Sequence, residues 1–230
     1  MKEKKHEETA LSLATVYLEK AMQAPGCPIC RRVREAEERW IWNVLYELTG
    51  DPKVHERFAT SFGLCREHAA LMAQVVETRE LVTPTGTARL YESAVAHVLH
   101  GLANFRTKKG LQREECPVCV VAEEAEERES WFLGKLLADP AFCAAYEKSD
   151  GLCLPHFLSV WSGAPKKVRA KLLADFQGRL ARLLVHLREL QRKERFDVHE
   201  PPTPEEIASW REALWRLGGM SYPAPLIRRG

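Results

Sequence analysis

The chain has 230 residues, of which 45% are hydrophobic and 29% charged, and its formal net charge is +2. This composition is that of a folded protein and excludes the fibrous and largely disordered classes, while the small net charge does not by itself indicate nucleic-acid binding. No apolar run approaches the roughly 20 residues that a membrane-spanning helix needs, and acidic residues interrupt the start where a signal peptide would be apolar. We therefore expect a cytoplasmic protein with no membrane partner.

The chain contains an internal duplication. Residues 27–68 align with residues 116–156 with one single-residue gap at Gly50. The identities comprise CPxC, the acidic block EAEER, one tryptophan, one leucine, Asp-Pro and SxGLCxxH. A repeat of this kind predicts that one structural unit occurs twice. We expect a first helical repeat at 9–108, a second at 109–198, and a C-terminal helix and tail at 199–230.

In chain order, each copy predicts a leading helix, a helix of about five turns opened by CPxC, a turn at Asp-Pro, a short helix, a helix opened by GLCxxH, and a long helix. Residues 90–105 and 173–190 carry apolar side chains three and four apart, which is typical of amphipathic helices. Residues 203–217 predict a last helix, with Thr203 as N-cap and Glu206 completing a capping box. Strand signals are nearly absent. The sequence predicts an all-α, pseudo-twofold duplicated helical bundle.

Seven cysteines are present, and a structural disulfide framework is not expected in a reducing compartment. A separation of two residues lets two side chains meet one metal ion, and proline after the first cysteine is tolerated in a first helical turn. Helix N-termini also favour the thiolate form that a metal needs. We expect one Cys3His metal site per repeat. The ligands predicted for the first site are Cys27, Cys30, Cys65 and His68, and those for the second are Cys116, Cys119, Cys153 and His156.

The chemistry of these motifs leaves alternatives open. A CxxC pair alone could exchange a disulfide, but that reading does not account for the CxxH motif. A closed tetrahedral Cys3His set is typical of structural zinc, so we favour two zinc ions. Two iron-sulfur clusters are the alternative, and they would indicate a redox or oxidant-sensing protein.

The EAEER block follows each CPxC pair on the same helix. Its carboxylates could accept a hydrogen bond from a ligand histidine and fix the orientation of the ring, or pair with arginines on other helices. The candidates are Glu35, Glu38, Glu124 and Glu127. An enzyme that used these carboxylates would need a pocket lined by them, and no catalytic residue is predicted.

Other residues are given structural interpretations. His55 and Cys143 align with each other beside the Asp-Pro turn and stay outside the ligand set, because such residues are often simply buried. Trp42 and Trp131 are expected in the core. Basic residues between 166 and 195 are expected to form a solvated helix face, so nucleic-acid binding is possible but not favoured.

With CPIC and GLCREH in one copy and CPVC and GLCLPH in the other, the chain resembles a bacterial family of helical proteins of unknown function with duplicated CPxC and GxCxxH motifs. The resemblance covers most of residues 9–195. It implies a bacterial cytoplasmic protein and supports the eight ligands, but it carries no activity. We expect a metal-stabilised scaffold or interaction protein, possibly regulatory, with a protein partner.

Overall fold

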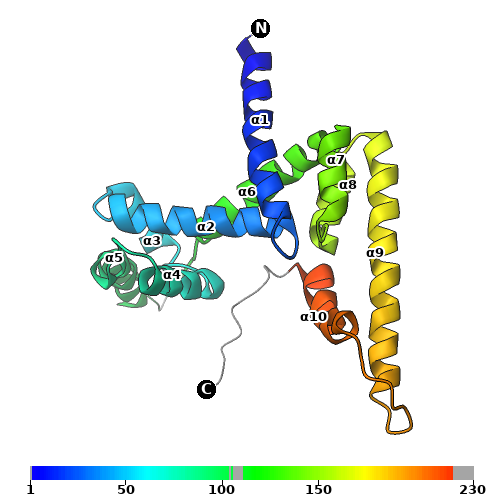
Figure 1. Ribbon diagram of the computed structural model, residues 1–230. Coiled ribbons are helices and arrows are strands. Elements are labelled where there is room, and N and C mark those ends of the chain that lie inside the picture. The colour runs from blue at the N-terminus through cyan, green and yellow to red at the C-terminus, as the bar shows by residue number, and fades with distance from the viewer. Residues whose placement is uncertain (1, 104, 106–110, 220–230) are drawn as a thin grey trace. The chain divides into compact units, whose positions relative to one another are not determined.

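A computed structural model describes residues 2–103, 105 and 111–219 of the chain, with only the backbone for 2–9. The described residues contain ten helices and no strand, which confirms the all-α class (Figure 1). None of these helices is long and apolar enough to cross a membrane. The helices are α1 (Lys2–Met22), α2 (Pro28–Glu47), α3 (Pro52–Thr60), α4 (Arg66–Thr78), α5 (Pro84–Ala103), α6 (Pro117–Leu136), α7 (Pro140–Lys148), α8 (Leu154–Gly163), α9 (Lys166–Lys193) and α10 (Pro204–Gly218).

Proline and side-chain caps determine where many of the helices begin. Six of the ten start at a proline, whose missing N–H costs nothing in a first turn. Asp51 and Asp139 cap α3 and α7 by accepting a hydrogen bond from a backbone N–H. Thr203 and Glu206 form the predicted capping box of α10. The sequence therefore predicted most helix starts correctly.

The chain forms two compact units that differ in composition from the two sequence repeats. Unit 1 comprises the residues up to Val33 and those from Glu126 onward, whereas unit 2 comprises Arg34–Ala125. The chain passes from one unit to the other within α2 and returns within α6. Each unit thus takes parts of both repeats. The tail at 220–230 lies outside the described residues.

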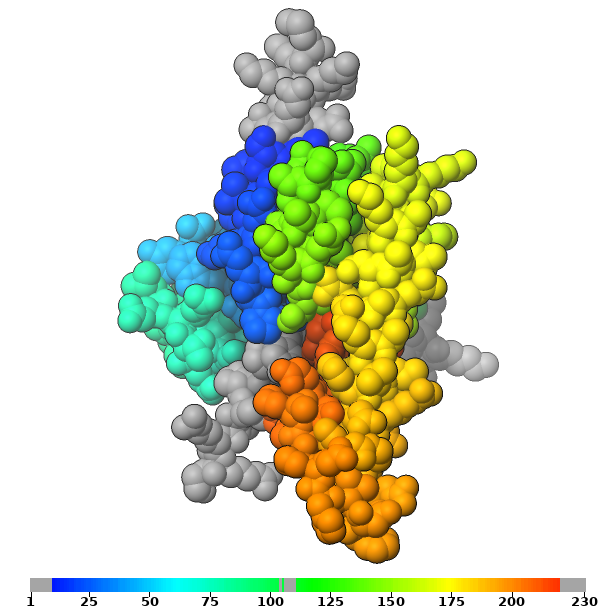
Figure 2. All heavy atoms as spheres, turned by 45° about the vertical axis from the view of Figure 1, so that its right-hand side comes forward, coloured from blue at the N-terminus to red at the C-terminus, as the bar shows by residue number. Residues whose placement is uncertain are grey.

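Unit 1 has its own apolar core. Its buried side chains come from α1, the first turn of α2, the end of α6, and α7 to α10, including Leu18, Leu133 and Trp215. In the ribbon view α9 runs beside α8 and α10, and in the space-filling view one side of α9 (yellow) lies at the surface (Figures 1 and 2). Phe157 of α8 stacks on Phe176 of α9 with ring centroids 4.3 Å apart. The helix predicted at 173–190 lies within α9; Phe176 and Leu183 of its predicted apolar face are buried, whereas Leu173 and Leu184 are exposed.

Unit 2 has a separate core around Phe58, which is fully buried. Phe58 contacts Tyr91 edge-on at 5.9 Å, which joins α3 to α5. The helix predicted at 90–105 overlaps α5, which begins earlier, at Pro84, and ends at Ala103. The apolar face of α5 is buried only near the start of the helix. Leu90 is fully buried, whereas Leu102 is 49% exposed.

Trp42 and Trp131, both expected in the core, are less buried than expected. Trp42 is half-buried, packs against the core of unit 2 and stacks on Tyr46. Trp131 is 44% exposed, and Lys135 lies over its ring, so the prediction that it anchors a core is wrong. A tryptophan ring can remain at a surface when a cation covers its face.

Candidate metal centres

The CPxC motifs occupy the starts of the two longest motif-bearing helices. Cys27 directly precedes α2 and Cys116 directly precedes α6, and in each case the second cysteine lies in the first turn. The three-residue separation places both thiols on one side of the helix. The local arrangement is the predicted one.

The CxxH motifs open α4 and α8. Cys65 and Cys153 are the N-cap residues of these helices, with extended backbone, and the histidine follows three residues later. The preceding glycines, Gly63 and Gly151, both have φ of +75°, a conformation that favours glycine. A Cβ at Gly63 would lie 2.6 Å from the Tyr91 ring, and one at Gly151 would lie 2.8 Å from Arg179. The glycine of GLC is therefore required by both conformation and space.

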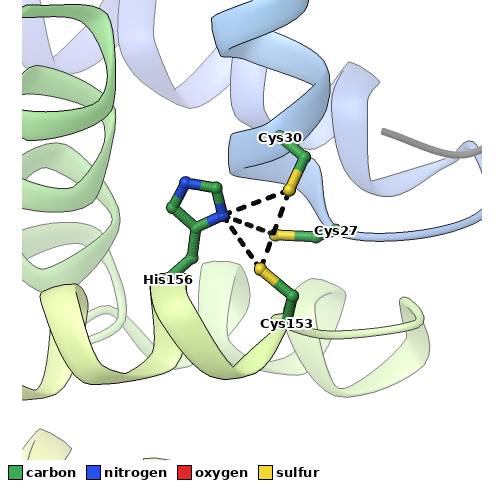
Figure 3. A group of neighbouring side chains, drawn as sticks. All are labelled: Cys27, Cys30, Cys153 and His156. Carbon is green, nitrogen blue, oxygen red and sulfur yellow. Dashed lines mark hydrogen bonds between the residues drawn. The ribbon is translucent and has the colours of Figure 1, made fainter. Parts of the chain in front are cut away.

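The eight predicted ligands gather into two groups, but the grouping differs from expectation. Each group combines the CPxC of one repeat with the CxxH of the other, so the prediction that each repeat holds its own four ligands is wrong. Within each group, all four ligand atoms lie within 4.8 Å of one another. Centre 1, in unit 1, consists of Cys27, Cys30, Cys153 and His156, and centre 2, in unit 2, consists of Cys65, His68, Cys116 and Cys119 (Figure 3 shows centre 1).

Helix length explains the exchange. The 20 residues of α2 rise about 30 Å, so the chain is carried far from Cys27 before it turns. The nine residues of α3 rise only about 14 Å, less than half of that length, so α3 alone does not retrace α2. The second repeat has the same helix lengths in α6 and α7. A CxxH motif therefore meets the CPxC pair of the other repeat.

The distances in centre 1 converge on the histidine Nδ1. This atom lies 3.4 Å from the Sγ of Cys27, 3.2 Å from that of Cys30 and 3.0 Å from that of Cys153 (Figure 3). The sulfurs of Cys30 and Cys153 are 3.7 Å apart. All four residues are buried.

Centre 2 has nearly the same dimensions. His68 Nδ1 lies 3.1 Å from the Sγ of Cys65, 3.6 Å from that of Cys116 and 3.4 Å from that of Cys119. The sulfurs of Cys65 and Cys119 are 3.8 Å apart. Metal bonds of about 2.3 Å to sulfur and 2.0 Å to nitrogen give a tetrahedron with sulfur–sulfur edges of about 3.8 Å and sulfur–nitrogen edges of about 3.5 Å. Both groups fit a single tetrahedral ion.

The electrostatics of centre 1 favour a thiolate beside an imidazolium when no cation is bound. Burial raises the pKa of the Cys27 thiol, but hydrogen bonds with Cys153, Cys30 and His156 outweigh it and lower that pKa well below its ordinary value. Hydrogen bonding to Cys153 and Cys27 raises the pKa of Cys30. For His156, burial lowers the pKa, but hydrogen bonds to Cys153 and Cys27 raise it to about 10. A bound divalent cation would take the place of the protons in the hydrogen bonds between these cysteines and His156.

Centre 2 follows the same pattern. A hydrogen bond to Cys116, followed by one to Glu37, raises the pKa of His68 to about 10. Burial raises the pKa of Cys116, but hydrogen bonds with His68 and with the backbone of Cys65, Cys119 and Val118 lower it to about 6, because N–H donors favour the thiolate. Burial and the charge of Cys116 raise the pKa of Cys119 to about 12.

The carboxylates that face the ligand histidines lie in the EAEER blocks, but they are not those predicted. Glu37 Oε1 lies 3.2 Å from Nε2 of His68 and is hydrogen-bonded to it. Glu126 Oε1 lies 3.5 Å from Nε2 of His156, at ion-pair distance but outside hydrogen-bond geometry. Glu37 follows Cys30 by seven residues, and Glu126 follows Cys119 by seven. Seven residues are nearly two full turns, so this spacing returns each carboxylate to the face of the cysteine.

The four carboxylates predicted to face the histidines have other surroundings. Glu38 pairs with Arg34 and Arg79, and together with Glu35 it lines a hollow of about 310 Å³ in unit 2. Glu124 and Glu127 are exposed. Glu35 and Glu38 thus share their hollow with Arg79, whereas Glu124 and Glu127 lie at the surface.

Arginines that sequence reasoning missed hold the loops before the CxxH motifs. Arg113 donates to the carbonyl oxygens of Ser61 and Leu64 in unit 2. Arg216 of α10 donates to those of Asp150 and Leu152 in unit 1. Each guanidinium satisfies two carbonyls of a turn whose backbone the helices leave unpaired. No motif marks these arginines, because the contacts join segments far apart in the sequence.

His55 and Cys143 lie outside both centres. The His55 ring is hydrogen-bonded at both nitrogens, to Ser93 Oγ at 2.7 Å and to the Thr49 carbonyl at 2.8 Å. Cys143 is buried, its Sγ lies 3.6 Å from a carboxylate oxygen of Glu147, and burial raises the pKa of the thiol. Neither residue belongs to a ligand group, as expected.

No family model, curated protein or solved structure matches the chain. The site must therefore be interpreted from its own geometry.

Proposed function

We propose that the protein is a helical scaffold that binds two structural zinc ions, one at each Cys3His centre, and presents its helices to a protein partner. The observation that carries this proposal is the convergence of four soft ligand atoms, all within 4.8 Å of one another, in each of two groups. Four protein ligands fill a tetrahedral zinc site and leave no position for a substrate water, which is typical of structural rather than catalytic zinc.

The dimensions favour a single ion over an iron-sulfur cluster. The sulfur–sulfur distances of 3.7 and 3.8 Å are close to the edge of one tetrahedron. A cluster distributes its protein ligands over several irons with sulfides between them, so ligands on different irons stand farther apart. Zinc also suits the closed three-thiolate and one-imidazole set. These points support zinc, with two clusters as the alternative.

An exposed apolar stripe on α10 supports the proposal that the protein binds a protein partner. Ile207, Trp210, Leu214 and Leu217 are each about half exposed, between 47% and 54%, and their spacing of three, four and three residues places them on one helix face. Exposed apolar groups of this kind often mark interaction sites, and tryptophan is enriched at their centres. The surface of α9 offers basic residues, but acidic ones are interspersed, so nucleic acid is the weaker candidate.

Metal analysis of protein purified without oxygen tests the proposal. We expect two zinc ions per chain and a colourless solution. Iron with acid-labile sulfide and visible absorption would overturn the choice of metal, and protein that neither holds nor takes up a metal would overturn the centres themselves.

A matched pair of variants tests the ligand assignment. Cys65→Ser is expected to lose one zinc ion per chain and to lower the stability of unit 2, because metal binding is coupled to folding. Cys143→Ser, at a buried cysteine outside both centres, is expected to keep two. Equal zinc content in the two variants would contradict the assignment of Cys65.

A further inference from the structure

The two centres differ in how well their sulfurs are covered. In centre 1 the three cysteines are 0% to 6% exposed. In centre 2 Cys116 is buried, whereas Cys65 and Cys119 are only half-buried and lie at the margin of the core of unit 2. Since oxidation of a thiolate requires access by the oxidant, this difference matters for reactivity.

The end of α10 covers centre 1. Gly219 caps this helix in the left-handed conformation, and its carbonyl oxygen lies 3.5 Å from Cys30 Sγ. A Cβ at Gly219 would lie 3.7 Å from the sulfur of Cys153 and 3.3 Å from the ring of Pro155. The chain itself therefore closes over two of the three sulfurs of centre 1.

The two half-buried cysteines of centre 2 also have adjacent sulfurs. Cys65 Sγ and Cys119 Sγ are 3.8 Å apart and belong to different helices, since Cys65 caps α4 and Cys119 lies in the first turn of α6. A disulfide needs about 2.05 Å, so the two sulfurs must approach by less than about 2 Å. Residues at helix starts can make such a movement more easily than residues in a helix interior.

We propose that Cys65 and Cys119 form a thiol oxidation site, at which a hydroperoxide converts the two zinc-bound thiolates to a disulfide and releases the zinc ion of centre 2. The inference rests on the proposed zinc scaffold and adds a regulatory property to one of its sites. Centre 1 keeps its ion under the same conditions, because its sulfurs are covered.

The chemistry balances without a further reactant. One thiolate attacks the hydroperoxide, the O–O bond breaks, and a sulfenic acid and an alcohol or water form after protonation. The second thiolate then attacks the sulfenic sulfur and displaces hydroxide, which takes a proton to give water. In sum, two thiolates, one hydroperoxide and two protons give one disulfide, one alcohol or water, and one water. Zinc is left with Cys116 and His68, which are too few ligands for a closed site.

The test is a zinc-release experiment on the full chain. Zinc content is measured first, and hydrogen peroxide is then added while released zinc is followed with a chromogenic chelator. Differential alkylation and mass spectrometry identify the oxidised cysteines at each time. We expect one zinc ion to leave at least about tenfold faster than the other, together with a disulfide between Cys65 and Cys119, because susceptibility follows exposure. Cys27, Cys30 and Cys153 should remain reduced during this phase.

Two variants sharpen the result. Cys119→His replaces one metal ligand by another and removes the disulfide partner; its zinc content is measured before peroxide is added, and any zinc held at centre 2 is expected to leave without the fast phase. Cys143→Ser should release zinc as the unmodified chain does. Release of both ions at one rate, a disulfide between Cys116 and Cys119, or absence of release would overturn the proposal. If the protein holds no zinc before peroxide is added, the proposed function is overturned as well. The initial zinc measurement therefore distinguishes failure of the zinc scaffold from failure of the oxidation site. If Cys119→His does not retain zinc, the identity of the oxidised cysteines in the unmodified chain tests the proposal.

Discussion

The histidine Nδ1 atom is the common neighbour of the three sulfurs in each centre. In centre 2 the other ring nitrogen, Nε2, is hydrogen-bonded to Glu37. Because a carboxylate can only accept, Nε2 carries a proton, and once the ring loses its second proton the lone pair of Nδ1 faces the sulfurs. One carboxylate therefore selects the tautomer that can bind a metal.

Removal of this carboxylate should weaken zinc binding at centre 2. Glu37→Ala is expected to lower the zinc affinity of that centre by about 10- to 100-fold, because the ring loses the acceptor that orients it. Competition with a chelator of known affinity measures the change. Glu38→Ala is the control, since Glu38 lies on the same helix as Glu37 and pairs with Arg34 of α2 and with Arg79 at the end of α4 rather than with His68. Equal losses in both variants would show that Glu37 acts only through helix charge.

Zinc binding at centre 2 should depend on pH. The hydrogen bond to Cys116 raises the pKa of His68 to about 10, and burial raises the pKa of Cys119 to about 12. Both groups hold a proton at pH 7 in the metal-free protein, and both must lose it to bind zinc. The affinity should therefore rise with pH by up to about 100-fold per unit between pH 7 and pH 9 and fall as the pH is lowered.

Calorimetry in two buffers with different ionisation enthalpies checks the number of protons. At least two protons should leave centre 2 for each zinc ion bound at pH 7. A zinc affinity that is constant between pH 7 and pH 8 would contradict the protonation states assigned to His68 and Cys119.

At the scale of elements, the starts of four helices place all eight ligands, and these starts were predictable from local signals. Proline after cysteine and glycine before the CxxH cysteine both mark helix boundaries without reference to the rest of the fold. The grouping of the ligands was not predicted, because alignment of the repeats suggests that each copy is self-contained. The lengths of α2 and α3 contained a signal, since a helix of nine residues is less than half as long as the 20-residue helix that it would have to retrace to reach Cys27.

The carboxylate prediction failed for a similar reason. The choice of Glu35 and Glu38 rested on their mutual spacing of three residues, whereas the relevant spacing is the one from the cysteine. Glu37 follows Cys30 by seven residues and thus lies on nearly the same face of α2. The arginine contacts of Arg113 and Arg216 could not be predicted from spacing at all, because they depend on tertiary packing.

The end of α10 offers an element-scale test beside centre 1. Gly219 has φ of +71°, and a Cβ there would meet Pro155 at 3.3 Å. Gly219→Ala is expected to cost about 1–2 kcal/mol from the left-handed backbone alone, and so to lower the melting temperature by about 2–8 °C. Gly218→Ala is the matched control, because a Cβ at Gly218 meets nothing within 4 Å. The melting temperatures of both variants are compared in the zinc-loaded state. Equal melting temperatures would contradict the assigned role of Gly219.

At the scale of the whole molecule, α2 and α6 each serve both centres. Helix α2 supplies Cys30 to centre 1 and Glu37 to the histidine of centre 2. Helix α6 supplies Cys119 to centre 2 and Glu126 to the surroundings of His156 in centre 1. The described chain thus has two units, each with its own core and its own ligand group, and it passes from one unit to the other within α2 and within α6.

The exchanged grouping predicts which fragment of the chain binds zinc. A fragment of residues 34–125 contains unit 2 with all four ligands of centre 2, and it should bind one zinc ion with the stability gain that metal-coupled folding brings. A fragment of residues 9–108 contains the complete first repeat but only half of each centre. It should bind zinc at least about 100-fold more weakly, because its cysteine pair and its CxxH motif are separated by the length of α2.

Cobalt substitution and chelator competition distinguish the two fragments. The spectrum of tetrahedral cobalt-thiolate coordination is expected only for residues 34–125. Tight binding by residues 9–108 would instead show that a single repeat can close its own site, and the lengths of α2 and α3 would then not determine the grouping. Because both fragments carry three cysteines and the same CxxH motif, a difference between them cannot come from the number of thiols. It must come from which helix starts the fold brings together.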